Sequence, residues 1–460
     1  MDNTNPQKDT NNLQERDGFA SRLGIIAAAA GSAIGLGNIW RFPYITGQYG
    51  GAAFILIYLI CIVLMGMPLM ISEFAIGRMA QKNAIGSFKK LAPHTYWFLI
   101  GVMGIAGAIM ILAFYGVVSG WCIDYVVRSA TNAFAGKSTE SIIHMFDGLI
   151  THTWMPLLWQ FVFMILTGII VIAGIQNGIE KYAKILMPLL LLIIIILDIR
   201  AVTLPGAKEG LSFLFKPDFT KLSTEVMFVA LGHAFFSLSI GMGTMITYGS
   251  YIGKRENLGV TALQVTIADT LVALLAGVAI FPAVFAFGIN PTEGPGLAFI
   301  TLPVVFQQMP FGNVFGTLFF LLLVVAALTS SISILEVIVA YFSEELKMSR
   351  KKATILSTTI VTLIGIPASL SNGPVLSNFK ILGFGFMDLL DYVSANILLP
   401  IGGLLILAFG GWYLGREKME RELTNGGTIQ SNYLSIFMIL TKFIAPIGIA
   451  LVFLKGLGFM

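Results

Sequence analysis

The sequence predicts an all-α membrane protein with eleven transmembrane helices, in which two five-helix halves are inverted repeats and the first and sixth helices are broken. Three observations carry this prediction: the composition, the number of long apolar stretches and a repeated glycine motif. Of the 460 residues, 56% are hydrophobic and 11% are charged, and the mean hydropathy is +0.85. Soluble domains carry about 25% charged residues. The composition therefore excludes a soluble globular protein, and a net charge of +4 gives no indication of nucleic-acid binding.

The apolar stretches set the number of spans. A membrane-spanning helix needs about 20 predominantly apolar residues. The candidate ranges are 21–46, 51–77, 95–127, 155–175, 180–200, 225–250, 258–287, 312–343, 352–370, 382–414 and 433–457. If the polar N-terminal segment is cytoplasmic, most of the 28 Lys and Arg residues fall in loops on the cytoplasmic side, as the positive-inside rule requires. An odd number of spans then places the C-terminus outside.

The predicted organisation follows from these spans. The segments are a cytoplasmic tail (1–20), a first half (21–200), an extracellular loop (201–224), a second half (225–415) and a last helix with the C-terminus (416–460). Within the second half, the extracellular loop 288–311 mixes Pro and Gly with apolar patches, a pattern that suits short helices. The sequence leaves open whether this loop is a lid or a connector.

The first and sixth spans share a motif that most membrane helices avoid. The chain reads AIGLGN from Ala33 to Asn38 and SIGMGT five spans later. Because five is odd, the two halves cross the membrane in opposite directions, which predicts an inverted repeat with paired discontinuous helices. A packing face of small residues would explain Gly31 and Gly35 but not Asn38 or Arg41. A dinucleotide loop fits poorly, since no third glycine or ribose-binding acid follows.

A break of this kind has a chemical use. Unwound backbone frees carbonyl groups to hold a cation and amides to hold an anion, and the helix ends add partial charges of about half a unit. Two such breaks could hold a zwitterion, with the Ser237 and Ser239 hydroxyls nearby. Thr329 and Ser330 in the eighth span add hydroxyls that suit a hard cation. Mid-span hydroxyls that only join helices are the alternative for this pair.

Ionisable residues deep in a span indicate function by default. Such acids are Glu73, Asp269, Glu336, Asp388 and Asp391. Arg41, at the outer end of the first break, needs an acidic partner, and Asp391 is the predicted one. Glu180 lies nearer a span end, where solvation would account for it.

Five stretches resemble the neurotransmitter:sodium symporters, whose bacterial members include leucine, tyrosine and multi-hydrophobic amino-acid transporters. They lie at 22–44, 66–78, 177–188, 235–251 and 327–333. The resemblance implies the five-plus-five fold of the leucine transporter and sodium-coupled uptake of an amino acid across a bacterial inner membrane. It implies no enzymatic activity and leaves the oligomeric state open.

The resemblance also implies a substrate site. Its residues would be Ala33, Leu36, Gly37, Ile111, Tyr115, Phe236, Ser237, Ser239, Met242, Ser330 and Ile334. Amides of Leu36 and Gly37 and the Tyr115 hydroxyl would hold the substrate carboxylate. Carbonyl groups at the two breaks and the Ser239 hydroxyl would hold its ammonium group. The side-chain pocket contains no unpaired charge, so we expect a neutral, hydrophobic L-amino acid, aromatic ones included.

Two sodium sites are implied in the same way. Sodium site one would use Ala33, Asn38, Ser237 and Asp269. Sodium site two would use carbonyls of Gly31, Ile34 and Ala326 with the hydroxyls of Thr329 and Ser330.

The implied moving parts lie on either side of these sites. Tyr115 with Phe236 would close the outer side beneath an Arg41–Asp391 ion pair. Arg16 would face Glu344 on the inner side, with Phe19 where the family usually has tryptophan. Gly178 and Pro188 predict that the fifth span is a hinge whose inner half unwinds, and a static kink is the alternative.

Asp269 departs from the asparagine usual in the family. It would supply the negative charge that chloride-dependent relatives take from chloride, and it would gain a proton after sodium leaves, so that proton antiport is expected. A structural aspartate capped by amides is the alternative.

A transporter-like sensor without flux and a membrane enzyme remain as other classes of function for this protein, although no HExxH or GxSxG motif is present.

Overall fold

A computed structural model of the chain describes residues 18–288 and 296–459. Within these ranges the protein is built from helices, and its single β-type contact is an isolated bridge between Ile381 and Phe384. Nine of the described helices are long and apolar enough to cross a membrane. A pair bent by 51° adds the first span, and the short apolar helix Thr224–Ser237 begins the sixth. Ten of the eleven predicted spans therefore match helices of membrane-spanning length and composition, and the sixth is made of two shorter helices, Thr224–Ser237 and Thr244–Gly249.

The first half contains two short helices besides its five spans. Its elements are α1 (Arg22–Ala33), η1 (Gly37–Arg41), α2 (Phe42–Gln48), α3 (Ala52–Cys61), η2 (Ile62–Gly66), α4 (Met67–Ala80), α5 (Ala84–Leu91), α6 (Phe98–Ala130), α7 (Thr139–Thr151), α8 (Met155–Ile172), η3 (Ile175–Glu180) and α9 (Lys181–Val202). The first span consists of α1, η1 and α2, and the second runs from α3 through α4.

The second half follows a connection that includes α10 (Ala207–Phe215) and η4 (Phe219–Lys221). Its elements are α11 (Thr224–Ser237), α12 (Thr244–Gly249), α13 (Leu258–Ala286), η5 (Leu297–Thr301), α14 (Leu302–Gln308), α15 (Gly312–Glu344), α16 (Arg350–Leu370), α17 (Phe386–Val393), η6 (Ser394–Leu398), α18 (Leu399–Ala408), η7 (Phe409–Leu414) and α19 (Gly415–Leu423). The last span comprises α20 (Leu434–Ile439), η8 (Leu440–Ile444) and α21 (Ala445–Gly456).

The tenth span differs from its predicted range of 382–414. The span starts at Phe386 and its last segment, η7, ends at Leu414, because Gly415 leaves the helical conformation with φ 70° and ψ −178° before α19 follows. The sequence of α19, GREKMEREL, is too polar to read as part of an apolar span. The span therefore begins four residues later than predicted and ends at the predicted residue, and the polar α19 follows after the break at Gly415.

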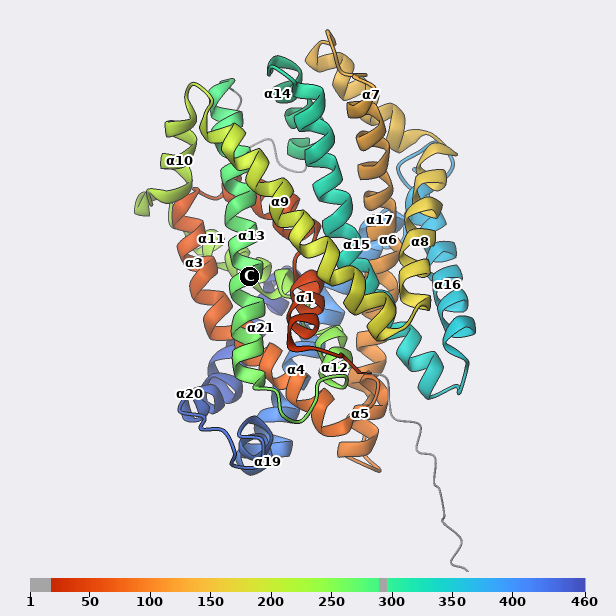
Figure 1. Ribbon diagram of the computed structural model, residues 1–460, viewed down its shortest axis with the longest axis vertical. Coiled ribbons are helices and arrows are strands. Elements are labelled where there is room, and N and C mark those ends of the chain that lie inside the picture. The colour runs from red at the N-terminus through yellow and green to blue at the C-terminus, as the bar shows by residue number, and fades with distance from the viewer. Residues whose placement is uncertain (1–17, 289–295, 460) are drawn as a thin grey trace, which may run out of the picture.

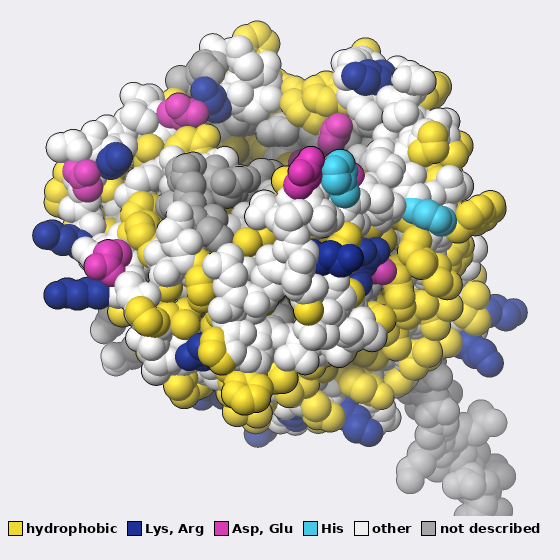
Figure 2. Space-filling model, turned by 90° about the horizontal axis from the view of Figure 1, so that it is seen from above, with side chains coloured by type: hydrophobic (Ala, Val, Ile, Leu, Met, Phe, Trp, Pro, Cys, Tyr) yellow, Lys and Arg dark blue, Asp and Glu magenta, His cyan; other side chains and the backbone are white. Residues whose placement is uncertain are grey.

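The helices form one bundle with α1 and α12 near its centre (Figure 1). We call the end that carries α7, α10 and α14 the α7 end, and the end that carries α5 and α19 the α5 end. Looking down on the α7 end, Figure 2 shows charged and histidine side chains on the face and hydrophobic side chains over much of the flank. Exposed apolar residues such as Ile165, Leu192 and Ile447 belong to α8, α9 and α21, as expected where helices face lipid.

Both predicted helix breaks are present. The first helix ends at Ala33, and Ile34 has an extended backbone with ψ 102° before η1 begins at Gly37. The second break separates Ser237 from Thr244. Gly241 and Gly243 adopt φ values of +86° and +80° there, a region that disfavours other residues. The glycines of the motif therefore allow the chain to leave and re-enter a helix within the bundle.

Candidate substrate and sodium sites

The two breaks meet at the carbonyl group of Ser32. The Ser239 hydroxyl donates to this oxygen at 2.8 Å, and the Ser330 hydroxyl donates to it at 3.0 Å. Ser32 is fully buried on the last turn of α1, while Ser239 belongs to the second break and Ser330 to α15. One backbone oxygen therefore joins three segments. Nothing in the sequence singled out Ser32, because any residue supplies a carbonyl group.

The residues predicted for sodium site two are close together. The Ser330 hydroxyl lies 3.4 Å from the Gly31 carbonyl oxygen and 3.2 Å from that of Ile34. The Thr329 hydroxyl donates to the Ala326 carbonyl at 3.0 Å. A Cβ on Gly31 would come within 3.2 Å of Thr329 Cβ, so a glycine lets α1 approach α15 closely. This set of neutral oxygens fits a hard monovalent cation.

The residues predicted for sodium site one surround the Asp269 carboxylate, which is fully buried on α13. Its Oδ1 accepts a hydrogen bond from Asn38 Nδ2 at 2.8 Å, and its Oδ2 accepts from the Ser237 hydroxyl at 3.0 Å. The structure thus brings Asn38, Ser237 and Asp269 together, with Ala33 buried at the end of α1. The site offers a negative charge and several oxygens to a cation, a donor set that fits sodium.

Tyr58 is a neighbour of site one that sequence reasoning missed. Its hydroxyl lies 3.4 Å from Asp269 Oδ2 and 3.3 Å from the Ser237 hydroxyl oxygen, and the whole side chain is buried. Tyr58 belongs to α3, where it sits in an apolar run without any motif. No local signal in the sequence distinguishes it from a tyrosine that only packs.

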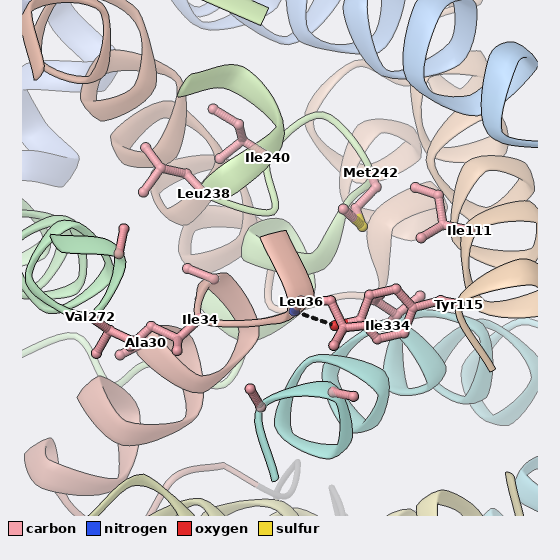
Figure 3. Packing of buried hydrophobic residues seen from close by; sticks show 14 of the residues in the cluster. Ala30, Ile34, Leu36, Ile111, Tyr115, Leu238, Ile240, Met242, Val272 and Ile334 are labelled. Atoms are coloured by element: carbon pink, nitrogen blue, oxygen red, sulfur yellow. Dashed lines mark hydrogen bonds between the residues drawn. The ribbon is translucent and has the colours of Figure 1, made fainter. Parts of the chain in front are cut away.

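The predicted substrate pocket lies beside the first break. The Leu36 amide donates to the Tyr115 hydroxyl at 3.0 Å, the bond drawn in Figure 3. Figure 3 also shows Ile111, Met242 and Ile334 in this region, and each of them is at most 3% exposed. The side chains predicted to contact the substrate side chain are therefore apolar or aromatic, and the polar groups lie at the backbone break.

The second break is held by a buried acid. Glu73 of α4 is fully buried, and its Oε1 accepts a hydrogen bond from the Gly241 amide at 2.6 Å. This contact satisfies an amide that the unwound segment would otherwise leave without a partner. The predicted functional acid in the second span thus supports the backbone on either side of Met242.

Comparisons with known proteins identify the family. The family model described as the sodium:neurotransmitter symporter family matches residues 16–144 and 139–459. The chain belongs to the sodium:neurotransmitter symporter family. Members of this family are secondary transporters and not enzymes, so the protein is a membrane transporter that couples sodium to a small-molecule substrate.

Individual relatives agree with this assignment. The crystal structure of MhsT in complex with L-phenylalanine is 47% identical, has a TM-score of 0.87 and covers 96% of this chain and 100% of that chain. A sodium-dependent transporter of Bacillus subtilis, YhdH, is 42% identical over 96% of this chain and 98% of its own length. A sodium-dependent transporter of Haemophilus influenzae is 39% identical over 97% of this chain and its whole length. The likeness to MhsT confirms the predicted leucine-transporter-like fold.

This symporter contains a cavity of about 210 Å³ beside the first break. Arg41, Tyr115, Phe236 and Asp391 all line it. The Arg41 guanidinium lies over the Phe236 ring, 4.8 Å from its centroid, and among the described residues Arg41 and Asp391 form no ion pair within 4.0 Å. In this conformation the guanidinium group contacts the aromatic ring. Arg41 and Asp391 line the same cavity but do not form the predicted ion pair.

The predicted inner contacts are partly described. Arg16 lies outside the described residues. Glu344 accepts hydrogen bonds from the backbone amide and the side-chain amide of Asn83, at 2.8 and 3.0 Å. Phe19 packs edge-on against Tyr248 and Tyr251, with ring centroids 5.5 and 6.1 Å apart. These contacts tie the segment before α1 to the α5 end of the bundle.

The segment around Gly178 is a π-helical turn, η3, that leads into α9. A Cβ on Gly178 would overlap the Ile170 carbonyl oxygen, so close packing against α8 requires glycine there in addition to any need for flexibility.

Glu180 is buried and not solvated, contrary to the prediction. It accepts hydrogen bonds from the Ala20 amide at 2.7 Å and the Ser21 hydroxyl at 2.8 Å. The start of α1 is therefore bonded directly to the predicted hinge.

We expect Pro188→Ala to slow sodium release and uptake by at least about threefold, because alanine restores a backbone hydrogen bond and stiffens α9. The measurement is the rate of sodium-dependent uptake together with solvent access to site two by hydrogen exchange. Pro367→Ala is the matched control, since Pro367 also lies inside a helix, α16, away from the sites. Unchanged rates in Pro188→Ala would favour a static kink.

Proposed function

We propose that this transporter takes up neutral, hydrophobic L-amino acids, aromatic ones included, by alternating access driven by two sodium ions. The observation that carries the proposal is a group of buried apolar side chains beside the breaks, Ile111, Met242 and Ile334, with the aromatic ring of Tyr115 next to them. No ionisable side chain projects from these positions. The related MhsT was solved in complex with L-phenylalanine, which supports this substrate class.

The breaks would hold the two charged ends of the substrate. Its carboxylate would accept from the amides of Leu36 and Gly37 and from the Tyr115 hydroxyl, replacing the present Leu36–Tyr115 hydrogen bond. Its ammonium group would face the carbonyls of Ala33, Phe236 and Ser237. Opposite helix-end charges at the breaks favour this orientation.

Asp269 would balance the charge of the bound ions. Two sodium ions bring positive charge into a buried site, where an uncompensated charge is very costly. The buried Asp269 carboxylate supplies one fixed negative charge beside the predicted ligands Asn38 and Ser237. We therefore propose that transport does not need chloride, and that Asp269 takes up a proton when the carrier returns empty.

The proposed orientation places the α5 end in the cytoplasm of a bacterium, with the membrane as its inner membrane. The lysines and arginines of the connections on that side, Lys82, Lys89, Lys254 and Lys351 among them, support it through the positive-inside rule. The N-terminus would then be cytoplasmic and the C-terminus extracellular.

Sodium-dependent uptake of a labelled amino acid into proteoliposomes tests the function. We expect uptake with an inward sodium gradient and none when potassium replaces sodium. A transporter-like sensor would bind the amino acid but show no flux under either condition, and that result would contradict the proposal.

The substrate class is tested by competition. We expect leucine, tyrosine and tryptophan each to inhibit labelled phenylalanine uptake more strongly than lysine or glutamate, since Met242 between two glycines can yield to bulky apolar side chains. The measurement is the concentration of each competitor that halves the uptake. Stronger inhibition by lysine or glutamate would reject this specificity.

A further inference from the structure

A small cavity adjoins the predicted sodium site two. It has a volume of about 10 Å³, close to the smallest space that holds a water molecule. Gly31 and Thr329 line it and also belong to site two, so the cavity and the site share a wall. Tyr248 and Ser333 form its polar side, and Ile179 and Ala183 form an apolar side.

The hydroxyl groups of Tyr248 and Ser333 form a short chain of hydrogen bonds in which each group donates to the next. The Tyr248 hydroxyl donates to Ser333 Oγ at 2.7 Å, and the Ser333 hydroxyl donates to the Thr329 carbonyl at 3.1 Å. Both hydroxyl hydrogens are therefore used along this chain, and the oxygens keep lone pairs that are not used by it. Such a wall accepts hydrogen bonds or binds a cation and does not attract an anion.

The cavity is also lined by the segment that is predicted to move when the inner side opens. Ile179 belongs to η3 and Ala183 to the first turn of α9, the segment that carries the predicted hinge. Phe19 packs on the ring of Tyr248 with a centroid distance of 5.5 Å. Tyr248 thus contacts the cavity beside site two on one side and the Phe19 ring on the other.

We propose that the Tyr248 and Ser333 hydroxyls form a third, transient sodium site, through which the ion passes after it leaves site two. The proposal rests on the proposed function. A sodium ion that gives up its ligands at Gly31 and Thr329 would otherwise meet only apolar side chains on this path, which is costly for a charge. Two hydroxyl oxygens replace part of the lost coordination, and opening of η3 then gives access to the cytoplasm.

The test uses Ser333→Ala and Tyr248→Phe, each of which removes one hydroxyl and keeps most of the packing. Equilibrium sodium affinity of the purified full-length protein should stay within about twofold of wild type, because site two is intact. Sodium release after rapid dilution into sodium-free buffer, followed by stopped-flow tryptophan fluorescence, should slow by about fivefold in each variant. The double variant should be little slower than either single one, since both hydroxyls serve one site.

Ser331→Ala is the matched control. Ser331 is fully buried on the same helix, its hydroxyl has no hydrogen-bond partner among the described residues, and it does not line the cavity. Its substitution should leave release at the wild-type rate.

Three outcomes decide the matter. Slower release at unchanged sodium affinity in both variants supports the transient site. Wild-type release in Ser333→Ala and Tyr248→Phe overturns it, and so does a loss of equilibrium sodium affinity, which would make the hydroxyls part of site two. Absence of sodium-dependent uptake by the wild-type protein is a different result, because it rejects the proposed function itself.

Discussion

Replacement of Asp269 by asparagine is expected to make transport depend on chloride. Without chloride, Asp269→Asn should lose nearly all sodium-dependent uptake, because the site then holds cations without the fixed negative charge that balances them. With chloride present, part of the activity should return. The wild type should transport equally well with chloride or with gluconate. Uptake by both proteins in the two media, together with sodium and substrate binding, is the measurement.

A matched control separates this effect from the general loss of a buried acid. Asp198 on α9 is 8% exposed, and its Oδ1 has no hydrogen-bond partner among the described residues. Asp198→Asn should show no response to chloride. Wild-type transport that requires chloride would reject the assignment of Asp269. So would an Asp269→Asn protein that binds sodium and substrate normally without chloride, since the aspartate would then be structural.

Replacement of Gly241 by alanine is expected to abolish transport. Gly241 has φ +86°, and an added Cβ would come within 2.8 Å of the Leu399 carbonyl oxygen. A left-handed backbone costs a residue with a Cβ roughly 1–2 kcal/mol, and the steric overlap adds to this. The strain would shift the break that places Met242 against the substrate. Binding of labelled substrate and the thermal stability of the purified protein are the measurements.

Gly383 provides a control with nearly the same backbone. Its φ is +87°, but apart from its chain neighbours no described residue has a heavy atom within 4 Å of the position of an added Cβ. Gly383→Ala therefore isolates the cost of the conformation from that of the overlap, and it should keep substrate binding. If Gly241→Ala bound substrate as well as Gly383→Ala does, the close approach to Leu399 would have no functional role.

The fold could be predicted because its signals are local. Long apolar stretches locate spans, and the paired glycines mark the two breaks by a pattern that needs no knowledge of distant contacts. The adjacent hydroxyls of Thr329 and Ser330 likewise indicated a cation site, because two neighbouring helical residues do not fit one packing seam. Each of these inferences depends on residues close together in the chain.

The remaining parts of the site depend on contacts between distant segments. Tyr58 reaches Asp269 across more than two hundred residues, and Ser32 contributes only its backbone. Glu180 was predicted to be solvated, because its position near a span end does not reveal that Ala20 and Ser21 bond to it. The position of the Arg41 guanidinium over Phe236 reflects the conformation of the outer cavity, which sequence alone does not specify.

The shared acceptor at Ser32 would link the predicted substrate site and the predicted sodium site two thermodynamically. The Ser330 hydroxyl contacts the Ser32 carbonyl and two of the oxygens predicted to hold sodium, while the Ser239 hydroxyl of the substrate site uses the same Ser32 oxygen. A ligand that rotates the Ser239 hydroxyl away from the Ser32 oxygen changes the hydrogen bond that the Ser330 hydroxyl can make to this oxygen, and the reverse also holds. Linkage requires that this influence be mutual, so bound sodium would change the substrate affinity by the same factor by which bound substrate changes the sodium affinity. The obligatory coupling of a symporter would then begin at a single peptide oxygen.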